Sequence, residues 1–263
     1  MIGHITMSNN NLIKDFDKAL KDRGLVISNS TDVNQIPPVN YSLARQIINK
    51  KDVLVPFLIH LALSLKDNNG HLSYIVKDIR DKGIIQQFLE NIKRLDLISR
   101  WRSIDVEGNL CYEVEVSKDE KKRRFFRSEW AELCFRHIIM RVVQQFCTSK
   151  ATPLSYKPLQ NVKITKAGDN NLFTELDLVV QIEKRFYVFE IKSGPWIRIM
   201  QWAKHENAFV YKDSPIRNIV CTVHDDIPAH IFEPQVLWSL KNIESCLGEM
   251  LRGDFPMSEK GKE

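Results

Sequence analysis

Two neighbouring stretches of the chain show the apolar pattern of β-strands. Residues 176–182 and 186–191 are rich in β-branched and aromatic side chains, and the polar pair Glu183 and Lys184 separates them. This pattern predicts a hairpin of two strands with its turn at that pair. In the resulting register Asp177 lies directly opposite Glu190, and both side chains point to one face of the hairpin.

The polar end of this hairpin carries the candidate chemistry. Lys192 stands two positions after Glu190 on the same strand and therefore shares its face. Two carboxylates opposite each other destabilise a hairpin, because like charges repel at this spacing. A divalent metal ion between them would remove that penalty. The ammonium of Lys192 could then stabilise charge on a phosphate or position a water molecule.

The segments around the hairpin predict a domain over residues 127–252. A long helix is expected over 128–146, a first strand over 152–164 and, after the hairpin, a helix over 196–209. Strands over 216–223 and 236–240 and a helix over 243–251 follow, and residues 253–263 form a tail. Alternating strands and helices after the hairpin predict an α/β (α+β) fold, in which helices flank a mixed sheet.

On the long helix, Glu132 heads the stripe of residues that faces the core. A carboxylate on this stripe needs a partner, and a metal site at the edge of the sheet would provide one. Glu129, one turn earlier, is the substitute candidate. In the alternative interpretation both glutamates are solvated first-turn residues that the helix dipole favours.

The first half of the chain has a different pattern. Residues 1–40 begin polar, include a short predicted helix over 11–21 and are typical of an N-terminal arm. Helices are predicted over 41–49, 53–65, 72–80 and 84–95, and a hairpin over 97–104 and 110–116. This order predicts a winged helix-turn-helix-like domain over 41–117, joined to the second half by a charged linker over 118–126. Such a domain would dock on DNA through its last helix and through its wing, where Arg100 and Arg102 lie; dimerisation or spacing is an equal alternative.

The residues of the second half carry a resemblance to a known family. Asp177 followed by Glu190-x-Lys192 resembles the active site of the PD-(D/E)xK, or restriction-endonuclease-like, nucleases. More narrowly, TELD and EIKSG are similar to the NELD and ECKTG blocks of CRISPR-associated nucleases in which a cyclic-oligoadenylate sensor domain precedes the nuclease. Glu129-Trp130-Ala131-Glu132 stands where that family has G-W-L-E. The resemblance covers residues 125–252 and does not include the sensor domain, so activation by that ligand is not expected.

This resemblance implies a restriction-endonuclease-like fold and a metal-dependent nuclease that hydrolyses phosphodiester bonds, with DNA expected as substrate ahead of RNA. Mg²⁺ or Mn²⁺ would activate a water molecule and polarise the phosphoryl oxygen. Lys192 would orient or deprotonate that water or stabilise the transition state. The expected metal ligands are Asp177, Glu190, the Ile191 carbonyl and Glu132. Two other classes stay open: a DNA-binding regulator on a nuclease-like scaffold, and an assembly module whose carboxylates form ordinary ion pairs with Lys192.

Length, charge and composition limit the number of domains, the partners and the location that we expect. A length of 263 residues allows one large domain or two small ones, and a net charge of +5 is compatible with a nucleic-acid partner. The longest apolar run, 53–65, is too short to span a bilayer, and the first residues do not resemble a secretion signal. A cytoplasmic protein without a membrane partner is expected, and a homodimer or a regulatory partner subunit stays open. The scattered cysteines and histidines lack the spacing of a zinc site.

Overall fold

The computed structural model describes residues 9–21, 24–32, 38–65, 70–168, 172–194, 215–225 and 236–256. The chain divides into two compact units, each of which is described by itself. Unit 1 comprises Met1–Ile36 and Ile138–Glu263, and unit 2 comprises Pro37–His137. No helix in these described ranges has the length and apolar character that crossing a membrane requires.

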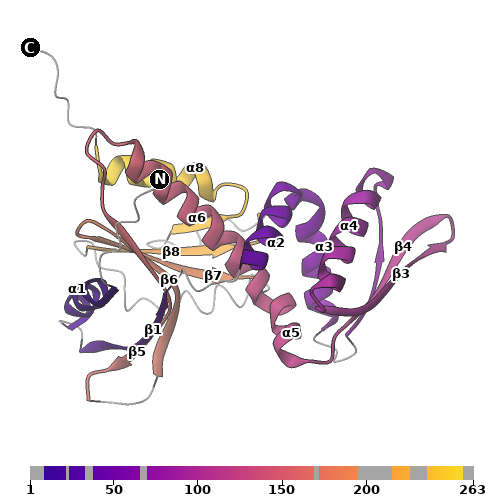
Figure 1. Ribbon diagram of the computed structural model, residues 1–263, viewed down its shortest axis with the longest axis horizontal. Coiled ribbons are helices and arrows are strands. Elements are labelled where there is room, and N and C mark those ends of the chain that lie inside the picture. The colour runs from indigo at the N-terminus through magenta and orange to yellow at the C-terminus, as the bar shows by residue number, and fades with distance from the viewer. Residues whose placement is uncertain are drawn as a thin grey trace, which may run out of the picture. The chain divides into compact units, whose positions relative to one another are not determined.

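Unit 1 is built on a six-stranded mixed sheet with the order β1-β5-β6-β7-β8-β9 (Figure 1). Its strands are β1 (Leu25–Asp32), β5 (Tyr156–Lys166), β6 (Leu172–Ile182), β7 (Arg185–Lys192), β8 (Ile216–Thr222) and β9 (Val236–Ser239). The first four pair antiparallel in spatial order, and β7, β8 and β9 pair parallel. The expected mixed sheet is therefore confirmed; the helix predicted over 196–209 lies outside the described residues.

The N-terminal segment belongs to this sheet, which corrects the prediction of an arm over residues 1–40. Helix α1 (Asn9–Lys21) buries Phe16 and Leu20 completely, and β1 pairs antiparallel with β5. The rings of Phe16 and Phe186 lie 5.1 Å apart, so α1 covers the sheet face that also carries Val179 and Val188. A domain that began at residue 127 would lack both the first strand and this cover.

The opposite face of the sheet is covered by α8 (Ile243–Asp254) and by the second half of α6 (Trp130–Ser149). Figure 1 shows these two helices together on one side of the sheet and α1 on the other. An ion pair between Arg141 and Glu244, 2.6 Å long, joins α6 to α8. The sheet is thus enclosed from both sides, as expected for strands that are apolar on both faces.

The buried side chain of Asp254 connects the end of α8 to the sheet through ion pairs and a hydrogen bond. The side chain of Asp254 is only 8% exposed and pairs with Arg217 at 2.9 Å and with Arg185 at 3.3 Å. The Tyr187 hydroxyl donates a hydrogen bond to it at 2.8 Å. Burial by itself would raise the pKa of Asp254, but the hydrogen bonds from Arg217 and Tyr187 and the two arginine charges outweigh it and lower the pKa. The helix therefore continues into the segment predicted to be a tail from Gly253.

Unit 2 combines helices with a three-stranded antiparallel sheet of order β2-β4-β3. Its elements are α2 (Pro38–Asn49), α3 (Lys51–Ser64), β2 (His71–Ile75), the 3₁₀ turn η2 (Ile79–Asp81), α4 (Lys82–Arg94), β3 (Ile98–Val106), β4 (Asn109–Val116), α5 (Glu120–Arg124), the π-helical turn η3 (Phe125–Glu129) and the start of α6. The helices predicted over 41–49, 53–65 and 84–95 and the hairpin after them are confirmed.

Two predictions in unit 2 are wrong. Residues 72–80 were expected to form a helix, but the segment begins with β2, in which the buried Leu72 pairs with Val114 of β4. Residues 118–126 were expected to be a linker, but they form α5 and the start of η3, where Phe125 and Phe126 are buried. In both cases a partner distant in the sequence decided the conformation.

We expect Asp254→Asn to lower the free energy of unfolding by about 1–3 kcal/mol at neutral pH, because it weakens charge-assisted hydrogen bonds to a buried group. Since the pKa of Asp254 is lowered in the folded state, this contribution is present above the unfolded pKa of about 3.9 and is lost as the pH falls through the folded pKa. Urea unfolding at neutral and acidic pH measures both effects. Glu249→Gln, on the exposed side of α8, is the control. A loss of equal size at both pH values would contradict this account.

Candidate functional site

Strands β6 and β7 stop pairing with each other at the point where the candidate residues lie. Their antiparallel ladder ends with Leu178 opposite Phe189, in the register predicted from the turn. Beyond that pair β6 remains bonded to β5, and β7 remains bonded to β8. The strands therefore part immediately before Asp177 and Glu190, so the predicted cross-strand pair of these two residues does not form. We call this place, with Asp177, Glu190, Ile191 and Lys192, the fork site.

A side chain replaces the ladder hydrogen bond at the fork site. The backbone N–H of Ile191 donates to Oδ2 of Asp177 over 2.6 Å. Because a buried backbone N–H needs an acceptor, this bond allows the two strands to part without leaving the donor unsatisfied. It also holds the Asp177 carboxylate against β7.

Glu190 and Lys192 form an ion pair on one face of β7. The side chain of Glu190 is 4% exposed, and the Lys192 ammonium pairs with its Oε1. A buried carboxylate is costly unless an opposite charge and hydrogen bonds compensate it. Lys192, whose side chain is 29% exposed, supplies that charge from the solvent side.

The charges of both carboxylates act on a buried thiol of the neighbouring strand. Cys221 on β8 is fully buried and pairs with Ile191 of β7. Burial raises the pKa of Cys221 well above its ordinary value, and the charges of both Asp177 and Glu190 raise it further. One thiol thus lies within electrostatic range of both acids.

The donor atoms of the fork site fit a hard cation. The Asp177 and Glu190 carboxylates and the Ile191 carbonyl are oxygen donors, and Mg²⁺ commonly takes only one or two protein carboxylates while keeping several waters. No cluster of three or more His, Cys, Asp or Glu side chains suited to a metal occurs among the described residues. Two carboxylates and one ammonium would leave a net negative charge at the fork, which favours a cation.

Glu132 and Glu129 belong to unit 2, whereas the residues of the fork site belong to unit 1. Glu132 lies 4.0 Å from the buried guanidinium of Arg136, and Glu129 pairs with Arg124 at 3.0 Å. Burial raises the pKa of Glu129, and the charge of Arg124 partly offsets that rise. The partner that Glu132 was expected to find in a metal is therefore already present on its own helix.

His224 is a candidate residue that the sequence analysis missed. It follows β8, whose Thr222 pairs with Lys192. Its ring Nε2 lies 3.0 Å from the Gly194 carbonyl oxygen, so this contact helps to fix the position of the chain just after Lys192. Adjacent parallel strands bring the residues after their carboxyl ends to one edge of a sheet, and this rule could have pointed to His224.

In unit 2, the arginines of the predicted wing are paired with acids. Arg100 and Arg102 on β3 lie 2.5 Å from Glu115 and Glu113 on β4, and the hydrogen bond from Arg102 lowers the pKa of Glu113. The hairpin therefore carries less net positive charge than its arginines alone suggest.

No protein-family model matches the chain, and no curated protein matches it. Among solved structures the chain is similar to the crystal structure of protein VC1899 from Vibrio cholerae, with a TM-score of 0.53 and 14% identity. The similarity covers 91% of this chain and 60% of that chain, so the chain spans less than two thirds of its structural neighbour. At this identity the likeness shows a shared mixed α/β fold.

We expect Asp177→Asn to leave the free energy of unfolding nearly unchanged in metal-free buffer, because the amide oxygen can still accept from the Ile191 N–H. Asp177→Ala should lower it by about 1–2 kcal/mol, because that N–H then loses its acceptor. Urea unfolding with a chelator present measures the difference, and Glu175→Ala, in the exposed first part of β6, is the control. Equal losses for the two Asp177 variants would show that charge, and not the hydrogen bond, holds the fork site together.

Proposed function

We propose that the chain is a metal-dependent nuclease that hydrolyses phosphodiester bonds at the fork site, with DNA as its substrate ahead of RNA. The observation that carries the proposal is the convergence of Asp177, Glu190 and Lys192 where β6 and β7 part. The same residues carry the resemblance to the PD-(D/E)xK nucleases. The proposal includes a restriction-endonuclease-like fold for the nuclease part of the chain and a winged-helix-like domain before it.

Hydrolysis of a phosphodiester needs a nucleophile at neutral pH and relief of the charge that develops on the phosphate. Mg²⁺ or Mn²⁺, when bound, supplies a water of lowered pKa and polarises the phosphoryl oxygen. Asp177, Glu190 and the Ile191 carbonyl would hold the ion, because they are the oxygen donors that such ions prefer.

Lys192 would act on the reacting phosphate or on the attacking water. Its ammonium is held by Glu190, and the chain just after it is held by the contact between His224 and Gly194. A charge fixed in advance stabilises a transition state better than one that must be repositioned during the reaction. The ion pair with Glu190 therefore supports an electrostatic or water-orienting role for Lys192.

The topology of unit 2 favours a second candidate, a DNA-binding regulator without catalysis. Helix α3, strand β2, the η2 turn, α4 and the hairpin of β3 and β4 follow one another in the order of a winged helix-turn-helix domain. Because Arg100 and Arg102 are paired with glutamates, docking would rely more on α4 than on the hairpin. Such a regulator would bind DNA with a steep salt dependence and would not cut it.

The Glu190–Lys192 ion pair also suits a purely structural fork site, and metal binding separates this alternative from the nuclease. If the proposal holds, calorimetry detects Mn²⁺ binding to the wild-type protein and none to Asp177→Asn, because one of the two carboxylate ligands is lost. Glu175→Gln should bind as the wild type does. A wild-type protein without measurable affinity for Mn²⁺ or Mg²⁺ would leave the fork carboxylates a structural role only.

Lys192→Met tests the reaction itself, because it keeps the apolar stem and removes only the charged head. With Mn²⁺ present, the single-turnover rate should fall by about 10²–10³, the usual effect of losing a preorganised charge. Nucleic-acid affinity should fall far less, since one phosphate contact among many is lost. Supercoiled DNA, linear DNA and single-stranded RNA are the substrates, and Lys184→Met in the exposed turn is the control. A Lys192→Met protein that cuts at nearly the wild-type rate would rule out this active site.

A further inference from the structure

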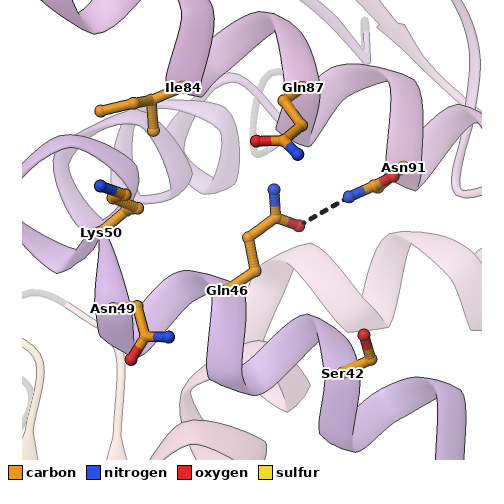
Figure 2. Close-up of a pocket in the computed structure, with 7 residues that line it drawn as sticks. All are labelled: Ser42, Gln46, Asn49, Lys50, Ile84, Gln87 and Asn91. Carbon is orange, nitrogen blue, oxygen red and sulfur yellow. Dashed lines mark hydrogen bonds between the residues drawn. The ribbon is translucent and has the colours of Figure 1, made fainter.

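A groove of about 300 Å³ lies in unit 2 between α2 and α4 (Figure 2). A volume of this size is at the small end of the range for sites that bind small molecules. Its lining residues are Ser42, Gln46, Asn49, Lys50, Ile84, Gln87 and Asn91. We call this hollow the amide groove, because four of these seven side chains are carboxamides and none is acidic.

Two carboxamides of the amide groove are oriented by a bond between the two helices. Asn91 Nδ2 donates to Gln46 Oε1 over 2.9 Å, and both residues are half-buried. Since the oxygen of Gln46 is used by this bond, its nitrogen is the group that points toward Gln87, as Figure 2 shows. Gln87 is exposed and can both donate and accept. The bond thus sets the positions of Gln46 and Asn91 in advance, and Gln87 adds a donor and an acceptor that can turn toward a ligand.

This arrangement can match the hydrogen-bonding edge of adenine, which places the N6 donor beside the N7 acceptor. Because the Gln46 oxygen is already used, Gln46 would donate to N7 through its nitrogen, and the Gln87 oxygen would accept from N6. Guanine places two acceptors on the same edge and is read best by arginine or lysine. No arginine lines the groove, and Figure 2 shows its single lysine, Lys50, beside Ile84 and apart from the bond between Gln46 and Asn91.

The remaining lining residues suit the other parts of a nucleotide. Ile84 offers an apolar surface for the face of a base. Lys50 is exposed and carries the one formal charge among the lining residues, and an ammonium is a common partner of phosphate. An acidic side chain in the lining would oppose a phosphate, and none is present.

We propose that the amide groove binds an adenine base that carries a phosphate, either as a free adenine nucleotide or as an unpaired adenosine within a nucleic-acid strand. The carboxamides of Gln46 and Gln87 read the base, and Lys50 holds the phosphate. This site does not depend on the proposed nuclease activity. Its test uses a chelator and no turnover, so its failure and the failure of the fork site are separate results.

Calorimetry of the full chain with adenosine monophosphate, adenosine and guanosine monophosphate tests the proposal. We expect one site per chain, and at least about fivefold tighter binding of adenosine monophosphate than of guanosine monophosphate. Gln87→Leu should weaken binding of adenosine monophosphate by about tenfold. Lys50→Gln should remove the advantage of adenosine monophosphate over adenosine.

Gln86→Leu is the matched control, because Gln86 is the neighbouring residue on α4, lies outside the groove and donates to Glu90 at 3.3 Å. It should bind as the wild type does. A short deoxyadenylate oligomer distinguishes the two sources of the ligand: tighter binding than the mononucleotide identifies a strand, and equal or weaker binding identifies the free nucleotide. Equal affinity for the adenine and guanine nucleotides, or unchanged binding by Gln87→Leu, would overturn the proposal.

Discussion

The hydrogen bond from the Ile191 N–H to the Asp177 carboxylate is the constraint on which the fork site depends. Where two paired strands part, each loses partners for its backbone groups, and an unsatisfied buried N–H is expensive. Asp177 supplies the missing acceptor from a side chain. The same bond holds the negative charge of Asp177 next to β7, the strand that carries Glu190. One hydrogen bond therefore both allows the strands to part and places the Asp177 carboxylate beside that strand.

Charge compensation decides what such a fork site can do. Glu190 is almost fully buried, and its charge is tolerated because Lys192 lies beside it. In a structural role the Glu190 carboxylate would serve the ion pair with Lys192, whereas in a nuclease it would also coordinate a metal ion. The two functions therefore differ in whether the fork site has affinity for a divalent cation, although the ion pair itself is common to both.

Unit 2 distributes its recognition chemistry differently from what its basic residues suggest. Arg100 and Arg102 are paired with acids on the neighbouring strand, and Lys122 and Arg124 are paired with Asp96 and Glu129. Surface pairs of this kind contribute little to stability, but they reduce the positive potential available to a phosphate backbone. The neutral carboxamides between α2 and α4 are free of acidic neighbours in the groove lining, and neutral donors and acceptors favour selective recognition over general attraction.

The sequence by itself determined the hairpin, its turn at Glu183 and Lys184, its register as far as Leu178 opposite Phe189, and the amphipathic helix α4. These features depend on residues close together in the chain, so periodicity and turn chemistry are enough to predict them. Only the tertiary structure decided that β1 joins the sheet through β5, that residues 71–75 form a strand on β4, and that His224 reaches Gly194. These strand pairings and the contact of His224 join residues far apart in the sequence. Local patterns do not contain that information, because the energy of a strand edge or a buried charge depends on the partner that the fold brings to it.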